Sequence, residues 1–396
     1  MIGFEEACRL VFGLARPLGV EMVTLERAAG RTCSAPVVAG HSAPAVATSA
    51  MDGYAVCEAD LAAEARLLEV IGDVFAGQQG FAGEMAPGRC VRIFTGAPLP
   101  RGADRVVMQE IVCREGARIR LAEPPGKNRH VRGVGSDFAQ GDQLIARGAT
   151  LTPQAVVTAA AADLAAVEVY RRPQVAILTT GDELAEPGSA STIPGAIPES
   201  VSFGVAALAQ QWGADVVERR RVRDDLDALQ AAARTALAGA DLVVTTGGAS
   251  VGEKDFARAM FEPFGLEIIF AKVAIRPGKP VWLGRAGDKL ILGLPGNPSA
   301  AMVTARLFLA PLLAGLGGRD PASAWRWRPV PLARALETCG ERECFHRAQG
   351  RVGGVLPVDN QDSSSQKTLA AADLLIRRRP GARALSAGEL VEVLDF

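Results

Sequence analysis

The spacing of apolar residues changes along the chain and predicts its elements. Residues 4–16 carry apolar side chains at helical spacing, which predicts an amphipathic helix. A second helix is predicted over residues 152–163, because Thr152 and Pro153 stand where an N-cap and a first helical turn would be. Between the two helices, short strand-like runs separated by glycine and proline indicate a small inserted β domain. These runs are residues 65–71, 90–95, 105–111 and 118–122.

From residue 173 onward, patterns of buried strands alternate with helical patterns. Strands are predicted at residues 175–179, 215–222, 242–245, 266–274, 281–283 and 290–292. Helices are predicted at residues 202–212, 225–237 (capped by Asp224) and 256–264, and after Asn297 and Pro298. This alternation indicates right-handed crossovers and a parallel, doubly wound sheet, which binds ligands beyond the carboxyl ends of its strands.

The last part of the chain loses helical periodicity. Residues 325–396 contain strand-like runs at 328–333, 351–358, 374–379 and 390–394. They predict a small β-barrel or sandwich, joined to the preceding domain by a linker at residues 315–323. The fold class is therefore a multidomain α/β protein.

Composition narrows the function classes. A chain of 396 residues suggests two to four domains, and a net charge of −1 gives no global attraction to nucleic acid or to anionic membranes. Seven scattered cysteines without a C-x-x-C motif indicate reduced thiols, and with only three histidines they argue against a zinc site. Glu5 and Glu6 stand where a signal peptide would be basic, and no run of about 18 apolar residues is evident. We therefore expect a cytoplasmic protein.

Glycine-rich and acidic residues follow the predicted strands. Residues 243–255 read VVTTGGASVGEKD, where glycines let backbone N–H groups approach an anion; the alternative is a tight turn joining a strand to a helix. We expect one crevice to contain Glu183, Asp224 and Asp255 beside cations of the stretch KVAIRPGK at residues 272–279. That combination suits a Mg²⁺-assisted reaction on phosphate groups, although each residue alone is also compatible with a solvated loop charge.

Two common nucleotide-binding fingerprints are absent from these loops. The glycines are adjacent rather than arranged as G-x-G-x-x-G, and Gly252 is followed by Glu253 and Lys254 rather than by the Gly-Lys-Ser/Thr of a Walker A loop. Another kind of nucleotide-dependent enzyme is therefore the weakest of the functional alternatives.

A set of motifs along the chain resembles one known family. TSAMDGYAV, FTGAPLPRGADRVVMQE, LTTGDEL, VVTTGGASVGEKDF, RPGKP and GLPGNPSA occur in the order and at the separations of the molybdopterin molybdenumtransferases, MoeA in bacteria and the E domain of gephyrin in animals. The resemblance covers essentially the whole chain. It implies a mixed N-terminal domain (residues 1–48 and 133–172), an inserted β arm (49–132), a doubly wound molybdopterin-binding domain (173–318) and a C-terminal β-barrel (325–396).

The resemblance also implies an activity and partners. The expected enzyme is a molybdopterin molybdotransferase, which inserts molybdate into adenylylated molybdopterin with release of AMP and requires Mg²⁺. A homodimer is implied, with the active site between the doubly wound domain of one chain and the arm and barrel of the other. A molybdopterin adenylyltransferase would act upstream, and a molybdoenzyme or its chaperone downstream.

Site residues follow from the resemblance by position. The catalytic candidates are Asp52, Thr95, Glu183, Asp224 and Asp255, of which the last three are also the metal-binding candidates. The substrate-binding candidates are Asp137, Gly247, Gly248, Ser250, Gly252, Lys272, Arg276, Lys279, Pro295, Asn297, Arg342 and Ser363. Arg342 and Ser363 match barrel residues that face the partner chain's site.

Some positions depart from the family pattern. Val201 replaces an asparagine that could bind a ligand or cap a helix, Arg276 replaces a lysine, and Asp362 and Asp373 replace a glycine and an asparagine in the barrel. An alternative function is therefore a catalytically weak paralogue that acts as a pterin-binding, carrier or scaffold protein.

Overall fold

A computed structural model describes residues 1–62, 67–247 and 256–396. The described residues form two compact units. The larger unit comprises Met1–Ala35, Arg147–Thr152 and Ala166–Phe396, and the smaller unit comprises Pro36–Ala146 and Pro153–Ala165. Four candidate site residues, Gly248, Ser250, Gly252 and Asp255, lie outside the described residues. The four-part division expected from the sequence stays a prediction.

The larger unit is built on a mixed sheet with the strand order β16-β13-β17-β21-β20-β18. Its strands are β13 (Gln174–Thr180), β16 (Asp215–Val222), β17 (Leu242–Thr246), β18 (Leu266–Phe270), β20 (Trp282–Ala286) and β21 (Lys289–Leu294). β13 pairs in parallel with both β16 and β17, and β17 pairs in parallel with β21. The chain therefore crosses to the other side of β13 after β16, which confirms the doubly wound topology.

One edge of this sheet differs from the expected parallel arrangement. β20 runs antiparallel to both β21 and β18. Only Gly287 and Asp288 separate β20 from β21, and so short a connection can join only antiparallel strands. The expectation of an entirely parallel sheet was wrong at this edge.

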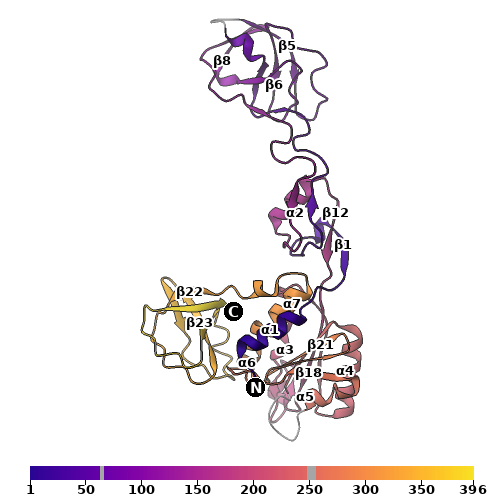
Figure 1. Ribbon diagram of the computed structural model, residues 1–396, viewed down its shortest axis with the longest axis vertical. Coiled ribbons are helices and arrows are strands. Elements are labelled where there is room, and N and C mark those ends of the chain that lie inside the picture. The colour runs from indigo at the N-terminus through magenta and orange to yellow at the C-terminus, as the bar shows by residue number, and fades with distance from the viewer. Residues whose placement is uncertain (63–66, 248–255) are drawn as a thin grey trace. The chain divides into compact units, whose positions relative to one another are not determined.

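Helices cover both faces of the sheet (Figure 1). They are α1 (Phe4–Leu14), α3 (Val201–Gln211), α4 (Leu226–Gly239), α5 (Phe256–Ala259), α6 (Pro298–Thr304) and α7 (Ala310–Leu316), with the π-helical turn η6 (Ala305–Leu309) between the last two. Side chains alternate along β13: Val175 and Ile177 pack with α1, α3, α6 and α7, whereas Ala176 and Leu178 pack with α4 and α5.

Two predicted helix boundaries were wrong. Asp225, not Asp224, caps α4, because its carboxylate accepts a hydrogen bond of 2.8 Å from the N–H of Ala228. The helix predicted over residues 256–264 ends at Ala259 and is followed by a 3₁₀ turn, η5 (Glu262–Phe264), in which Pro263 has no N–H to continue an α-helix.

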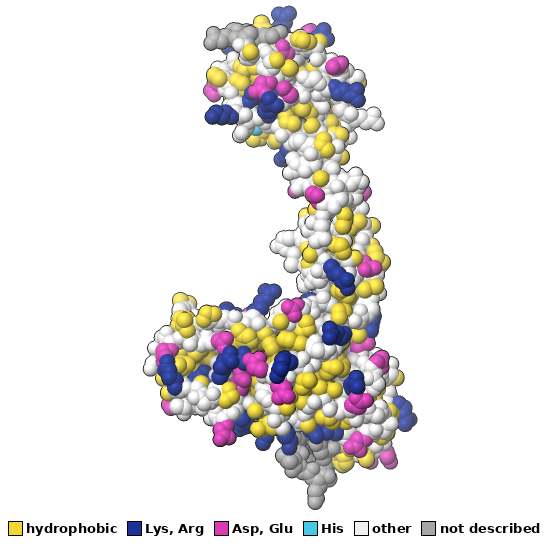
Figure 2. Space-filling model, viewed as in Figure 1, with side chains coloured by type: hydrophobic (Ala, Val, Ile, Leu, Met, Phe, Trp, Pro, Cys, Tyr) yellow, Lys and Arg dark blue, Asp and Glu magenta, His cyan; other side chains and the backbone are white. Residues whose placement is uncertain are grey.

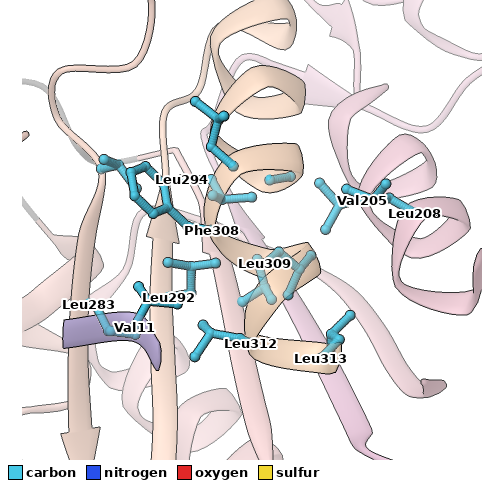
Figure 3. Packing of buried hydrophobic residues seen from close by; sticks show 14 of the residues in the cluster. Val11, Val205, Leu208, Leu283, Leu292, Leu294, Phe308, Leu309, Leu312 and Leu313 are labelled. Atoms are coloured by element: carbon cyan, nitrogen blue, oxygen red, sulfur yellow. The ribbon is translucent and has the colours of Figure 1, made fainter. Parts of the chain in front are cut away.

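The helix from Pro298 to Leu316 lies in the centre of the core (Figure 3). Figure 3 shows Phe308 and Leu312 beside Val11 of α1 and Leu292 of the sheet. The helix is long and apolar enough to cross a membrane, a run that the sequence pattern did not reveal, but 94% of it is buried inside the protein. Such burial is typical of a core helix.

A second sheet closes into a barrel within the larger unit. Its strands are β19 (Ile275–Arg276), β22 (Arg328–Pro331), β23 (Glu343–Arg351), β24 (Gly354–Pro357), β25 (Leu374–Arg378) and β26 (Leu390–Asp395), in the order β19-β23-β25-β26-β22 with β24 on β23. The N–H of Ala333 donates to the Val355 carbonyl at 2.8 Å, so the chain after β22 meets β24 and closes the sheet. Phe345 and Leu375 of the barrel belong to the same core as α1.

The smaller unit contains the inserted β structure. Its main sheet has the order β7-β4-β6-β5-β9-β8, with β4 (Gly53–Val56), β5 (Leu68–Val74), β6 (Arg89–Ile93), β7 (Arg105–Met108), β8 (Val112–Glu115) and β9 (Arg118–Leu121). The unit also contains α2 (Pro153–Ala161) and the strand pairs β2 (Val37–Val38) with β11 (Gln143–Ile145) and β3 (Thr48–Ser49) with β10 (Val131–Arg132). The predicted strand at residues 105–111 ends earlier, because residues 109–111 form a 3₁₀ turn, η3 (Gln109–Ile111).

Short elements complete the larger unit. These are the strand pairs β1 (Val20–Thr24) with β12 (Ala166–Tyr170) and β14 (Leu184–Ala185) with β15 (Ile197–Pro198), and the 3₁₀ turns η1 (Leu25–Arg27), η4 (Ala190–Thr192) and η7 (Pro321–Ala324). The smaller unit contributes a further turn, η2 (Glu58–Leu61). On the face shown in Figure 2, basic and acidic side chains are interspersed over both units, in keeping with the small net charge.

We expect His346 in the barrel to make stability sensitive to acid. Burial, with smaller contributions from Arg378, Arg276 and Arg347, lowers the pKa of His346 to about 4. An unfolded histidine binds a proton near pH 6.5, so the folded state loses stability as pH falls from about 6.5 towards 4. His346→Gln should reduce the loss of unfolding free energy between pH 7 and pH 5 by about 2 kcal/mol. Urea unfolding at both pH values measures this, with His41→Gln as the control; an unchanged pH dependence would contradict it.

Candidate functional site: a glycine-lined crevice and an adjoining basic cleft

The carboxyl ends of β13, β17 and β21 border a cleft of about 680 Å³. The residues that follow these strands line it, namely Gly181 and Glu183 after β13, Gly247 after β17, and Pro295, Gly296 and Asn297 after β21. The cleft lies at the point where the strand order reverses, which is where a doubly wound sheet binds its ligand. We call this cleft the crevice.

Glycines at the strand ends let the loops of the crevice meet closely. Gly247 has a φ of +91°, and a Cβ there would lie 2.4 Å from the carbonyl oxygen of Thr180. Gly181 has a φ of +145°, and a Cβ there would lie 2.8 Å from Oε2 of Glu183. Both positive φ angles favour glycine, and the absence of a Cβ lets the strand-end loops approach each other at the edge of the crevice.

Hydroxyl and amide groups form the polar lining. Thr246 Oγ1 donates a buried hydrogen bond of 3.1 Å to Thr179 Oγ1, whereas the buried Thr180 Oγ1 has no partner among the described residues. Asn297 Nδ2 donates to Ser363 Oγ at 2.9 Å, so a barrel segment reaches the crevice of its own chain. The expectation that Ser363 faces the partner chain's site stays a prediction. An unpaired hydroxyl beside an amide suits a ligand with several oxygen acceptors.

Acidic side chains stand at the rim. Glu183 is exposed and Asp224 is half-buried, and both line the crevice. The neighbouring Asp182 accepts a hydrogen bond of 3.2 Å from the Asp224 N–H. Among the described residues, no three His, Cys, Asp or Glu side chains converge on a preformed metal site. Two hard oxygen donors nevertheless fit Mg²⁺, which takes one or two carboxylates and completes its shell with substrate oxygens and water.

The sequence departure before α3 has a structural consequence. Val201 belongs to the hydrophobic core, and Glu199 caps the helix instead. Its buried carboxylate accepts hydrogen bonds from the Ser202 N–H at 2.8 Å and the Ser202 hydroxyl at 2.5 Å, and it lies 3.6 Å from Arg219 Nη1. The capping role that the replaced asparagine could have served is therefore filled by a neighbour.

The basic side chains lie in an adjoining cleft rather than in the crevice. Arg276, Lys279 and Arg342 together line this second cleft of about 530 Å³, which we call the basic cleft. Lys279 directly precedes Pro280, which lines the crevice. Gly278 explains this placement, because its φ of +103° turns the chain so tightly that a Cβ would lie 2.2 Å from Thr304 of α6. Lys272 does not line this cleft; its carbonyl accepts from the Ile2 N–H at 3.0 Å.

Asp362 and Asp373, the two acidic barrel residues that depart from the family pattern, accept hydrogen bonds from nearby backbone groups. Asp362 Oδ1 accepts hydrogen bonds from the N–H and hydroxyl of Ser364, at 2.8 and 2.7 Å, and these bonds lower the pKa of Asp362. Asp373 Oδ1 accepts from the Gly350 N–H at 2.8 Å. Both carboxylates stabilise turns of the barrel segments.

The candidates in the smaller unit are Asp52, Thr95 and Asp137. Asp52 Oδ1 accepts from both the N–H and the hydroxyl of Thr95, each at 2.8 Å, and the backbone bond, followed by the hydroxyl bond, lowers the pKa of Asp52. Asp137 is exposed, and its N–H donates to the Ala43 carbonyl at 3.0 Å. Asp52 and Thr95 therefore form a hydrogen-bonded pair, in which Thr95 keeps the Asp52 carboxylate ionised.

Three family models together match almost the whole chain. They are the MoeA N-terminal region (domains I and II) at residues 2–162, the probable molybdopterin binding domain at 176–315, and the MoeA C-terminal region (domain IV) at 329–396. This chain belongs to the MoeA family. The resemblance found in the sequence motifs is thereby confirmed.

Relatives agree with this assignment over most of their length. The molybdopterin molybdenumtransferase of Haemophilus influenzae is 36% identical over 88% of this chain and 84% of its own, and that of Bacillus subtilis is 34% identical over 99% and 94%. The crystal structure of the molybdopterin biosynthesis MoeA protein from Pyrococcus horikosii superposes with a TM-score of 0.86 at 28% identity, covering 100% of this chain and 99% of that one. The expected multidomain α/β fold and enzyme class are confirmed.

Several polar residues of the crevice were missed by the sequence reasoning. These are Thr180, Thr246, Glu199, Ser364 and Gln366. A signal for Thr180 and Thr246 was present, because both β13 and β17 end in two threonines and are followed by a glycine. Two buried strands with identical polar ends indicate a shared site at the edge of a parallel sheet.

We expect Gly247→Ala to disrupt the crevice. The new Cβ would overlap the Thr180 carbonyl, so the strand ends must separate in addition to the strain of a positive φ. Gly188→Ala is the matched control, because Gly188 has a φ of +94° with nothing within 4 Å of its Cβ position. Gly247→Ala should lower the unfolding free energy by about 2 kcal/mol more than Gly188→Ala does, measured by urea unfolding. Equal losses would contradict the proposed contact.

We also expect Thr95→Val to raise the pKa of Asp52 towards its ordinary value, since the hydroxyl donor is lost while the N–H donor remains. Carboxyl carbon NMR during a pH titration measures this shift. Thr95→Ser retains the hydroxyl and should restore the low pKa; a pKa of Asp52 that is insensitive to both changes would contradict the pairing.

Proposed function

We propose that this protein inserts molybdenum into molybdopterin: it takes adenylylated molybdopterin and molybdate, breaks the phosphoanhydride with release of AMP, and leaves molybdenum on the dithiolene sulfurs. The observation that carries this proposal is the pair of adjoining clefts. An acidic, glycine-lined crevice at the sheet's switch point adjoins a cleft lined by Arg276, Lys279 and Arg342. The reaction has two anionic reactants, and each cleft suits one of them.

The crevice would bind the pterin nucleotide through its phosphate groups. Gly181, Gly247 and Gly296 leave the backbone open to the phosphates, and the hydroxyl of Thr180 supplies a donor that no described residue uses. Asn297 is already held by Ser363, so its amide is oriented before a ligand binds. Gly248, Ser250, Gly252 and Pro295 complete the proposed set of binding residues.

Glu183, Asp224 and Asp255 would hold Mg²⁺. When bound, the ion would neutralise charge on the phosphoanhydride oxygens as a Lewis acid. Glu183 stands at the rim in the turn that follows the buried strand β13.

The basic cleft would bind molybdate. A tetrahedral oxyanion needs several donors, and two guanidinium groups and an ammonium group supply them in one place. Arg276, where the family has lysine, offers a planar fork of donors in this cleft. Lys272 would act from the neighbouring strand end. Consecutive residues line the two clefts, Lys279 the basic cleft and Pro280 the crevice, and this would keep the two reactants close.

The assembly and the pathway partners belong to the same proposal. We propose a cytoplasmic homodimer in which Asp52, Thr95 and Asp137 of one chain complete the site of the other. A molybdopterin adenylyltransferase would supply the adenylylated pterin, and a molybdoenzyme or its chaperone would accept the product. The mixed N-terminal domain, arm, doubly wound domain and barrel would then be the working parts of the dimer.

The test is AMP release from adenylylated molybdopterin by the purified protein with molybdate and Mg²⁺. Glu183→Gln removes one crevice carboxylate and should lower the rate about 100-fold or more. Glu186→Gln, an exposed position just beyond the short strand β14, is the matched control and should leave the rate unchanged. Asp52→Asn should lower the rate to a similar extent without changing the fold, as circular dichroism would verify.

Failure of this test has a defined meaning. Calorimetry that shows tight pterin-nucleotide binding without AMP release would favour the carrier or scaffold function. Restoring the family residues with Val201→Asn and Asp362→Gly should then raise activity. AMP release that is equal in Glu183→Gln and Glu186→Gln would contradict the proposed role of the crevice.

A further inference from the structure

Two cysteines flank the loop that carries Arg342. Cys339 precedes this loop and Cys344 ends it, on strand β23. Cys339 Sγ lies 3.2 Å from the carbonyl oxygen of Arg342, and Cys344 Sγ lies 3.5 Å from the same oxygen. Both side chains also line one cavity of about 320 Å³. The two thiols therefore converge on a single acceptor from opposite ends of the loop.

The backbone fixes both ends of the loop. The Cys339 N–H donates to the Ala382 carbonyl at 2.8 Å, and Cys344 pairs with Arg378 in the sheet. Cys339 Sγ also lies 3.7 Å from the Arg378 carbonyl. Anchored backbones bring the sulfurs together in the folded state, so a bond between them closes only a short loop.

The loop belongs to the basic cleft. Gly340, Glu341, Arg342 and Cys344 all line that cleft with Arg276 and Lys279. The two thiols contact the backbone of Arg342 itself, whose side chain is one of the cleft's cations. A change at the thiols therefore acts on the position of that cation.

The two thiols differ in environment. Cys339 is half-buried, whereas Cys344 is buried. Burial, followed by the contact with Cys339, raises the pKa of the Cys344 thiol to about 12. Cys339 is therefore the thiol that an outside reagent meets first, and Cys344 acts second.

We infer that Cys339 and Cys344 are a modification site that forms a reversible disulfide by exchange with a low-molecular-weight disulfide such as oxidised glutathione. The Cys339 thiolate attacks one sulfur of the reagent, and the first small thiolate leaves and takes up the proton that Cys339 lost. The Cys344 sulfur then attacks Cys339 in the mixed disulfide, and the second small thiolate leaves with the proton from Cys344. Two protein thiols are oxidised and one small disulfide is reduced to two thiols.

The bond changes what holds Arg342. A disulfide has no S–H donor, so the Arg342 carbonyl loses both of its contacts with thiol hydrogens, and the sulfurs must approach to about 2.05 Å of one another. The loop must adjust to satisfy the carbonyl elsewhere. This consequence rests on the proposed function, because it concerns the affinity of the basic cleft for an oxyanion; the disulfide itself does not.

The modification is tested on the full chain in glutathione buffers of increasing oxidation. Free thiols are blocked with N-ethylmaleimide, and mass spectrometry of peptides locates the bonds. We expect a bond between residues 339 and 344 that is lost in Cys339→Ser and in Cys344→Ser. Cys57→Ser and Cys113→Ser, at two other half-buried thiols that both belong to the smaller unit, should leave it unchanged. A stable glutathione adduct on Cys339 without the internal bond, or no loss of thiols, would overturn the inference.

A second measurement tests the proximity of the thiols without oxidation. Phenylarsine oxide binds two neighbouring thiols at once, so wild-type protein should retain one arsenical per chain after washing, and either serine variant should lose it. Retention by both variants would overturn the assignment of the pair.

The functional consequence is measured by equilibrium dialysis with molybdate. We expect the affinity of the oxidised form to differ from that of the reduced form by about fivefold or more and to recover on reduction. Equal molybdate affinities of the oxidised and reduced forms, with the disulfide present in the oxidised form, would overturn the inference that the disulfide controls the basic cleft. Absence of molybdate binding in both forms would instead count against the proposed function and leave the disulfide intact.

Discussion

The burial of one helix governs the arrangement of both clefts. In the helix from Pro298 to Leu316, 94% of an 18-residue window is buried, so neither the position nor the rotation of the helix can change without moving much of the core. Asn297 at its start lies in the crevice, and Thr304 about two turns later meets Gly278. Leu312 packs in the core that includes Val11 of α1. The packing of this helix therefore sets the distance between the acidic crevice and the basic cleft.

The same core joins the barrel to the sheet. Phe4 of α1 makes an edge contact with Phe345 of the barrel at 4.9 Å between ring centroids and lies 5.9 Å from Phe308 of the central helix. Arg377 of the barrel pairs with Glu343 at 2.5 Å and also with Glu5 of α1. Because these contacts are made within one chain, the loop of Arg342 and the segment of Ser363 are presented to the two clefts by a rigid support.

The sequence predicted those strands and that part of the site whose signals lie in short, continuous stretches of the chain. Continuous apolar runs predicted β13, β17 and β21, and the glycines and acidic residues after them predicted a crevice at their ends. Strand β23 was missed, because it contains Arg347, a buried side chain that donates to distant partners: the Asp362 carbonyl at 2.8 Å and the Ser299 hydroxyl at 2.5 Å. No local pattern reveals such bonds.

The division of the candidate site into two clefts also could not be predicted from local sequence patterns. The sequence placed the cations of residues 272–279 in the crevice, but the contact between Gly278 and Thr304 turns Arg276 and Lys279 towards Arg342. Likewise, the loss of an asparagine at Val201 suggested an uncapped helix, whereas Glu199 caps it from two residues earlier. The first difference arises from tertiary packing between residues far apart in sequence. The second arises because Glu199, a neighbour with a longer side chain, reaches the start of the helix.

The central claim is that the two clefts divide the reactants. It is tested most directly by the concentrations of molybdate and of adenylylated molybdopterin that give half-maximal AMP release in Lys279→Ala and in wild-type protein. We expect Lys279→Ala to raise the half-maximal molybdate concentration about tenfold or more, while the half-maximal concentration of the pterin nucleotide stays unchanged. An equal rise for both substrates, or a rise for the pterin nucleotide alone, would contradict it.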